Sequence, residues 1–337
     1  TGVNVAHQDD ERFRNDVNAQ GVVGEKTADE TQKATSAGVF AQGDLALTEQ
    51  VTFSLGARFD RVELEVDDHF LDNGDQSGEQ TFNEWSGSAG LSYRYRPEHQ
   101  VYVNTGTAFE TPTFSEFANP SGGGFNPSVE PQKAWNREVG ARGYIEPLAL
   151  DYDVTLFSVR VRDELVPYEE ENGGRTFYQN AGDTNRDGVE LALGWQLADQ
   201  WRLNSALTLA NYEFDRFATP TERFGGNRLP GLPEQTWVNQ LTWENLNDRF
   251  ATLETQYVGD MVADNANETD IDSYWLVNLR VGDGWQLGGD TRLNAFLGIR
   301  NLLDEDHYAN VRLNGTYGRY YEPAPGRSVY GGVEVSF

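Results

Sequence analysis

The amino-acid sequence predicts an all-β protein, an antiparallel transmembrane β-barrel of which this chain supplies about 14 strands. Three observations lead to this prediction. Apolar and polar residues alternate, in segment after segment, with the two-residue period of a strand that has one apolar face. The connections between these segments alternate between short and long. No apolar run approaches the ~20 residues of a membrane-spanning helix, whereas a barrel strand needs only roughly 9–11 residues of alternating polarity.

The composition narrows the classes of protein further. The 337 residues carry 26 Lys and Arg against 54 Asp and Glu, which gives a formal net charge of −28. Binding to nucleic acid depends on clustered basic residues, so we expect no nucleic-acid partner. The absence of Cys excludes disulfides, thiol nucleophiles and thiolate metal sites. The aromatic content of 12% argues against a disordered chain.

The strand segments follow one another along the whole chain. Residues 51–60 are the clearest case, because apolar or small side chains occupy alternate positions and polar residues fill most of the others. The same alternation recurs in residues 148–156, 201–209, 237–243 and 293–299. In all, we expect strands that begin near residues 2, 37, 51, 81, 100, 133, 148, 175, 200, 234, 248, 272, 287 and 326.

The connections favour a barrel in a membrane over a soluble sandwich. Short turns include residues 48–50, 146–147, 198–200 and 245–248. Long polar stretches lie between them, at roughly residues 14–36, 67–80, 110–132, 166–174, 214–233, 260–271 and 303–325. A soluble sandwich has no reason to keep its long loops at one end, whereas outer-membrane barrels have short periplasmic turns and long extracellular loops. By this parity the long loops are extracellular and Phe337 ends the last strand in the periplasm.

The placement of charged and aromatic residues fits the same topology. An Arg or Lys that faces lipid at the bilayer midplane costs about 2–4 kcal/mol, and the apolar faces of the segments above contain neither. Aromatic residues near strand ends match an interfacial girdle. These residues are Trp201, Trp237, Trp243, Trp275 and Trp285. The alternative is that each Trp simply packs within the sheet or core.

Several motifs occur in a fixed order along the chain. They are TGTAFETPTFSEF at 105–117, FNPSVEPQKAWNREVGARG at 125–143, FSVRVRDELV at 157–166, YQNAGDTNRDGVELALGW at 178–195, RLPGLPEQTWVNQLTW at 228–243, GIRNLLDEDHYANV at 298–311 and GRYYEPAPGRSVYGGVEVSF at 318–337. This ordered set resembles the TonB-dependent outer-membrane receptors, the family of siderophore and iron-complex receptors. The resemblance covers essentially the whole chain.

The resemblance implies a fold, a location and a function. The family's barrel has about 22 strands and contains an N-terminal plug domain, so residues 1–337 are expected to be the C-terminal portion of a barrel, with the plug domain and first strands absent. The whole receptor imports a ferric siderophore or similar iron complex across the bacterial outer membrane, energised by the TonB complex through the plug. It is not an enzyme. A terminal Phe, here Phe337, resembles the signal that such barrels present to the barrel-assembly machinery.

Two other interpretations stay open at this stage. An even number of strands also permits a complete, passive outer-membrane pore of about 14 strands. A soluble β-rich domain that binds or processes carbohydrate is the third possibility, with Trp and Asp residues holding sugars.

The sequence contains no catalytic constellation and predicts no cofactor. Its four His residues lack metal-ligand spacing. The stretch from Phe109 to Pro127, where haem receptors of the family carry a ligating His, contains none. A siderophore supplies the oxygen ligands of its own iron, so no metal-binding side chains are required. The acidic residues of stretch 260–272 can either hold Ca²⁺ or form a solvated loop.

The resemblance places the ligand where the extracellular loops and the apex of the plug converge, against aromatic and polar side chains. It also implies outer-membrane lipid as a partner of the barrel. The candidate ligand-binding residues are Phe114, Phe117, Phe125, Tyr168, Phe177, Tyr317, Arg319, Tyr320 and Tyr321. The planar fork of Arg319 suits a siderophore carboxylate or catecholate. The alternative role of Tyr320 and Tyr321 is to stiffen the final hairpin together with the prolines that follow them.

Overall fold

A computed structural model describes residues 1–18, 20–117, 119, 125–126, 128–169, 176–180, 182–218, 222–246 and 248–337 of the chain. Antiparallel β-strands make up most of these residues. Three short 3₁₀ turns, at Leu71–Asn73, Glu146–Leu148 and Thr316–Gly318, are their helical elements. Within the described residues, no helix has the length and apolar character needed to cross a membrane.

Fourteen strands form one continuous sheet, in which each strand pairs with the next sheet strand along the chain. The strands are β1 (Gly2–Val17), β2 (Val23–Ala46), β3 (Val51–Asp68), β4 (Gly78–Arg96), β5 (His99–Glu110), β6 (Gln132–Ile145), β7 (Leu150–Arg162), β10 (Asp183–Ala198), β11 (Trp201–Arg216), β12 (Gln235–Glu244), β13 (Phe250–Val258), β16 (Tyr274–Gly288), β17 (Thr291–Arg300) and β20 (Ser328–Ser336). The prediction of about 14 antiparallel strands is confirmed.

Three small hairpins lie in the long connections of this sheet. They are β8 (Leu165–Glu169) with β9 (Thr176–Asn180), β14 (Met261–Val262) with β15 (Asp270–Ile271), and β18 (Tyr308–Val311) with β19 (Tyr321–Pro323).

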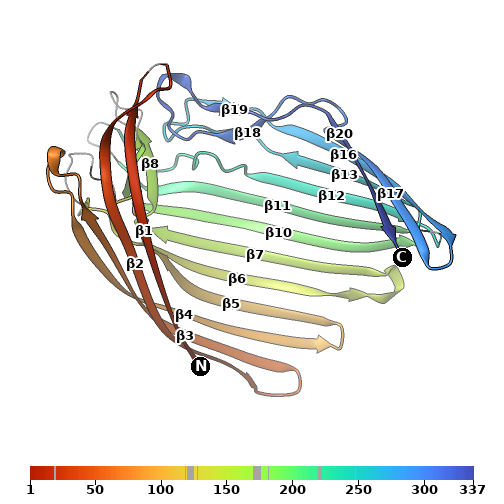
Figure 1. Cartoon of the computed structure of the whole chain (residues 1–337). Coiled ribbons are helices and arrows are strands. Elements are labelled where there is room, and N and C mark those ends of the chain that lie inside the picture. The colour runs from red at the N-terminus through yellow and green to blue at the C-terminus, as the bar shows by residue number, and fades with distance from the viewer. Residues whose placement is uncertain are drawn as a thin grey trace.

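The sheet is strongly curved but open, as Figure 1 shows. The strands β1 and β20 form its two edges, and within the described residues they do not pair with each other. The predicted barrel is therefore seen as an open sheet of 14 strands, and the expected closure and the total of about 22 strands are not part of this structure.

All strands except two begin within four residues of the predicted starts. The first exception is β2, which begins at Val23 rather than near residue 37, because residues 23–40 pair with β1 in a nearly continuous ladder. The predicted long loop 14–36 is thus wrong, and residues 18–22 make the connection. The second is β10, which begins at Asp183 rather than near residue 175, because residues 176–180 form β9 and pair with β8 instead.

All connections of the sheet except residues 18–22, a short connection at the end where the long ones lie, sort by length to its two ends. Short turns of two to five residues join β2 to β3, β4 to β5, β6 to β7, β10 to β11, β12 to β13 and β16 to β17. Because neighbouring strands are antiparallel, these turns all lie at one end, here called the short-turn end. The described parts of the connections at residues 69–77, 111–131, 163–182, 217–234, 259–273 and 301–327 gather at the opposite end, the long-loop end (Figure 1).

One face of the sheet is apolar and exposed. Across six neighbouring strands, the register places six aliphatic side chains in one row. The row consists of Leu91, Val103, Val139, Leu156, Val189 and Leu209, with exposed fractions between 36% and 52%. A continuous apolar surface of this kind marks a face that meets an apolar environment rather than water. We call it the apolar face, and the opposite one the polar face.

Aromatic residues border the apolar face at two levels. Trp237, Tyr257 and Trp275 are cross-strand neighbours on β12, β13 and β16, and the ring of Trp275 lies 6.0 Å from that of Trp237 and 5.0 Å from that of Tyr257. Trp285 lies on the same face of β16, ten residues from Trp275. That separation is about 34 Å along the strand and about 24 Å across a bilayer at a tilt of roughly 45°, close to the apolar band of an outer-membrane barrel.

Candidate functional site

The long-loop end is organised by three buried apolar clusters. The first loop cluster consists of Leu64, Phe82, Phe117 and Val129. Its members come from β3, β4 and the connection 111–131. The rings of Phe82 and Phe117 stack with centroids 5.8 Å apart, and Phe125 packs 5.0 Å from Phe117. This packing fixes the described part of the connection against the two strands.

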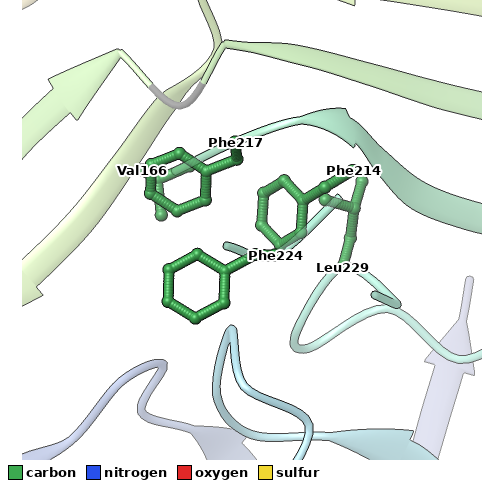
Figure 2. Packing of buried hydrophobic residues seen from close by; sticks show 5 residues of the cluster. All are labelled: Val166, Phe214, Phe217, Phe224 and Leu229. Carbon is green, nitrogen blue, oxygen red and sulfur yellow. The ribbon is translucent and has the colours of Figure 1, made fainter. Parts of the chain in front are cut away.

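The second loop cluster consists of Val166, Phe214, Phe217, Phe224 and Leu229, whose side chains point toward one another in Figure 2. Val166 belongs to β8, whereas the other four belong to β11 and the connection 217–234. The ring of Phe217 lies 5.2 Å from that of Phe214 and 5.1 Å from that of Phe224. The cluster therefore joins two connections that are separate in the sequence.

The third loop cluster consists of Val258, Met261, Ala263 and Ile271, all at or beyond the end of β13. Tyr320 and Val311 from the last connection pack against it. The backbone amide of Asn314 donates a hydrogen bond to the carbonyl of Ala263 at 2.9 Å. The third loop cluster thus holds the connections 259–273 and 301–327 together.

Polar contacts tie the second and third loop clusters to each other. The guanidinium of Arg228 donates to a carboxylate oxygen of Asp260 at 2.9 Å and lies 3.3 Å from Glu234. The side-chain oxygen of Asn267 accepts from the backbone amide of Arg228 at 2.7 Å. Gly231, at φ 75°, approaches Leu313 so closely that a Cβ atom there would lie 2.7 Å from its side chain. Three connections therefore form one linked body.

Replacing Arg228 with Met is expected to loosen this link by about 1–3 kcal/mol, because the carboxylates of Glu234 and Asp260 lose their shared cation. Amide hydrogen exchange of residues 228–232 and 260–267 measures the effect. The matched control is Arg61→Met, which breaks the exposed pair with Glu63 and is expected to cost about 0–1 kcal/mol. Equal exchange in the two variants would contradict the proposed role of Arg228.

A group of tyrosines and one arginine occupies the surface of the last connection. The ring of Tyr321 stacks on that of Tyr308 at 4.7 Å and meets the edge of Tyr320 at 6.0 Å. The guanidinium of Arg319 lies 5.9 Å from the ring centroid of Tyr317. Tyr317 is 84% exposed and Tyr321 43% exposed. We call Tyr308, Tyr317, Arg319, Tyr320 and Tyr321 the tyrosine group.

The structure separates the predicted ligand-binding residues into two sets. Tyr317, Arg319 and Tyr321 are exposed, and Tyr320 is half-buried against the third loop cluster. Phe117 and Phe177 are buried, and Phe114 and Phe125 pack against the first loop cluster. Tyr168 lies in β8, but its side chain falls outside the described residues. The sequence-based set omitted Tyr308, although the motif GIRNLLDEDHYANV contains it.

Contacts also join the hairpin β8–β9 to the connection 111–131. The side-chain oxygen of Asn180 accepts from the backbone amide of Glu130 at 2.9 Å, and its nitrogen donates to the Glu130 carbonyl at 3.0 Å. Partial burial, with the nearby carboxylate of Glu116, raises the pKa of Tyr178 above its ordinary value. Burial and the neighbouring carboxylate thus both favour the neutral form of the Tyr178 hydroxyl.

Two carboxylates of the acidic connection 259–273 have partners within the protein. Asp260 pairs with Arg228, and a carboxylate oxygen of Asp264 accepts from the backbone amide of Glu268 at 3.0 Å. In the part of the chain that the structure describes, no three His, Asp or Glu side chains lie close enough together to hold a metal ion.

The polar face carries a separate hollow near the short-turn end. Its volume is about 670 Å³, and polar and charged side chains line much of it. They include Arg94, Gln100, Arg142, Asp153 and Asn204. The hollow lies on the opposite end of the sheet from the tyrosine group, so the two surfaces are distinct.

Known proteins share both the sequence pattern and the fold. The ferrioxamine B receptor of Salmonella typhimurium is 27% identical over 288 residues, which cover 83% of this chain and 38% of that protein. The probable TonB-dependent siderophore receptor PiuA of Acinetobacter baumannii is 21% identical over 327 residues, which cover 92% of this chain and 41% of that protein. The chain thus spans less than half the length of these two relatives.

Solved structures give the same result for the fold. The crystal structure of the siderophore receptor PiuA from Acinetobacter baumannii superposes with a TM-score of 0.79 at 18% identity, over 99% of this chain and 52% of that one. The ferric-catecholate import receptor Fiu from Escherichia coli K12 superposes with a TM-score of 0.76 at 17% identity, over 99% and 51%. A family model described as TonB dependent receptor-like, beta-barrel, matches residues 1–302. This chain belongs to the TonB-dependent receptor β-barrel family of the outer membrane.

Proposed function

We propose that this chain is part of a receptor that imports a ferric siderophore or a similar iron complex across the outer membrane, energised through TonB. The observation that carries the proposal is the family match over residues 1–302. Relatives named as ferrioxamine B and siderophore receptors support the class of cargo. The linked long loops support it as well, since they present aromatic and cationic side chains at one end of the sheet.

We propose further that residues 1–337 are the C-terminal portion of the receptor barrel, and that a plug domain and additional strands complete it. The chain covers 38% and 41% of the two curated relatives. β1 and β20 are the edge strands of the sheet. Among the described residues, each of these two strands pairs with a neighbour on one side only. In lipid, unpaired backbone groups cost several kcal/mol each, so strands that complete the barrel would satisfy them.

In this proposal the apolar face contacts outer-membrane lipid, the long-loop end is extracellular and the C-terminus is periplasmic. The row from Leu91 to Leu209 and the two levels of aromatic residues support the lipid contact. Phe337 is 94% exposed at the end of β20, where the barrel-assembly machinery can reach it.

The tyrosine group is the proposed contact surface for the iron complex. Arg319 offers planar hydrogen-bond donors for anionic oxygens, and exposed Tyr rings offer flat apolar surface beside hydroxyls. The buried aromatics Phe117 and Phe177 would act from behind by holding the connections in place, together with Phe114 and Phe125. The complex brings the oxygen ligands of its iron, so the receptor needs only to recognise its organic shell.

Replacing Tyr321 with Ala is expected to weaken binding of the ferric complex about tenfold, because two ring contacts within the tyrosine group are lost. The assay uses the full-length receptor in cells starved of iron, with uptake of radioactive iron from a panel of siderophores. Tyr93→Ala is the matched control, since Tyr93 is also 43% exposed but lies near the short-turn end.

The same assay separates active import from a passive pore. Active import predicts that uptake stops when TonB is deleted, whereas a passive pore predicts uptake that continues without it. If no complex in the panel requires the receptor for uptake, the proposed function is wrong.

A further inference from the structure

The apolar face carries a cationic patch immediately beyond its aliphatic row, toward the long-loop end. On β6 and β7, the positions that continue the face beyond Val139 and Leu156 are occupied by polar and charged residues. These positions hold Arg137, Trp135 and Lys133 on β6, and Ser158, Arg160 and Arg162 on β7. The register sets Arg137 opposite Ser158, Trp135 opposite Arg160, and Lys133 opposite Arg162. Four cations therefore share two adjacent strands.

The patch contrasts with the rest of a chain whose formal net charge is −28. On β3 the same face continues beyond Phe59 with Arg61 followed by three carboxylates. Those are Glu63, Glu65 and Asp67, of which the last two pair with Lys33. On β6 and β7 the positions that continue the apolar face hold no carboxylate, whereas the adjacent strand β10 sets Asp187 opposite Ser158 and Asp183 opposite Arg162. Cations are thus concentrated on two strands of an otherwise acidic surface.

Two of the four cations have carboxylate partners, and two form no ion pair with any described residue. Arg160 makes a two-pronged contact with Asp187, at 2.8 and 2.9 Å, and Lys133 lies 2.8 Å from Glu84. Arg137 instead lies over the ring of Trp135, 3.5 Å from its centroid. Arg162 is exposed. The indole of Trp135 is held by its own hydrogen bond to the Thr105 hydroxyl at 2.7 Å.

The distance of the patch from the aliphatic row follows from the rise per residue of a β-strand. Arg137 is two residues beyond Val139, about 7 Å along the strand, and Arg162 is six residues beyond Leu156, about 20 Å along it. Trp135 lies between these levels, and an aromatic ring with a polar tip favours the boundary between hydrocarbon and water. A lipid whose acyl chains cover Val139 and Leu156 would thus hold its headgroup against Arg137 and Arg162.

We propose that Arg137 and Arg162 bind the phosphate groups of a phosphorylated, acylated lipid in the surrounding leaflet, at a site bordered by Trp135 and by the Arg160–Asp187 pair. Guanidinium groups pair with phosphate through parallel hydrogen bonds. The aliphatic row supplies the adjoining surface for the acyl chains, which a free phosphate ion would not use. This inference rests on the proposed placement of the apolar face in the membrane.

The test compares two lipids that differ by one phosphate. Full-length receptor is placed in phosphatidylethanolamine nanodiscs that contain either lipid A with two phosphates or its mono-phosphorylated form, and the glycolipid retained after lipid exchange is quantified by mass spectrometry. The unmodified receptor is expected to retain the bis-phosphorylated lipid about tenfold more strongly. The variant R137Q/R162Q is expected to lose this preference, whereas R137K/R162K keeps part of it. The control R61Q, on the same face of β3, is expected to retain it in full.

Three results would overturn the inference. They are equal retention of the two lipids by the unmodified receptor, an unchanged preference in R137Q/R162Q, and loss of the preference in millimolar inorganic phosphate, which would indicate an ion site instead. Heat-dependent electrophoretic mobility verifies that each variant is folded. Uptake of the ferric complex is measured on the same variants. If the receptor takes up the ferric complex but shows no preference between the two lipids, only the lipid site is refuted. If it prefers the bis-phosphorylated lipid but takes up no ferric complex, only the proposed transport function is refuted.

Discussion

Replacing Phe214 with Ala is expected to destabilise the second loop cluster by about 3–5 kcal/mol, because the substitution leaves a cavity where a large side chain was fully enclosed. Phe214 is only 1% exposed and contacts residues from two connections. The strands below pair through their backbones and do not depend on this ring. We therefore expect local unfolding of the connection 217–234 while the sheet persists.

Limited proteolysis and amide hydrogen exchange of residues 214–234 measure this effect. Phe13→Ala is the matched control, because the same atoms are removed from a side chain that is 59% exposed. The control is expected to change exchange little. If both variants exchange alike, the packing seen in Figure 2 does not stabilise the long loops.

Replacing Leu156 with Arg is expected to destabilise the folded receptor in lipid by about 1–3 kcal/mol, because the position lies on the apolar face two residues short of the cationic patch, and the cost of a lipid-facing Arg falls from about 2–4 kcal/mol at the bilayer midplane toward the interface. Leu156 is 52% exposed, so the loss cannot come from a tightly packed protein core. Reversible folding into lipid vesicles, followed by electrophoretic mobility in a urea series, measures it.

The control for Leu156→Arg introduces the same Arg side chain on the opposite, polar face of the sheet. Gln42→Arg puts the same side chain on the polar face of β2, where Gln42 is exposed. We expect a change of less than about 1 kcal/mol there. Equal destabilisation by the two variants would contradict the assignment of the apolar face to lipid.

Most of the sheet was predictable because a strand with one apolar face leaves a two-residue period in the sequence. β3 shows this period over residues 51–60, β11 over 201–209 and β17 over 293–299, and the starts of β3 and β11 were predicted within one residue. The period fails in residues 23–36 of β2, where polar residues occupy both faces and only pairing with β1 makes the segment a strand. It also fails to separate β9 from β10, since residues 175–183 hold few apolar positions.

The candidate site was predictable only as a region. Connection lengths placed the long loops at one end, and the motifs drew attention to their aromatic residues. Whether an aromatic ring is buried depends on partners that are distant in the sequence, as when Leu64 and Phe82 enclose Phe117. The sequence shows no period in such loops, so Phe117 and Tyr317 looked alike, although one is 1% and the other 84% exposed.

The linked long loops also bear on how such a receptor can acquire a new specificity. Val166 packs into the cluster of the connection 217–234, and Tyr320 packs into that of 259–273. A loop grafted from another receptor would therefore arrive without the residue that its neighbour contributes. Exchange of neighbouring loops in pairs keeps their shared cluster intact, whereas exchange of a single loop opens the cluster that it shares with its neighbour. Recombination between relatives, in nature or in the laboratory, should accordingly succeed most often when its breakpoints fall in the short turns. The hairpins whose loops share a cluster are then exchanged together.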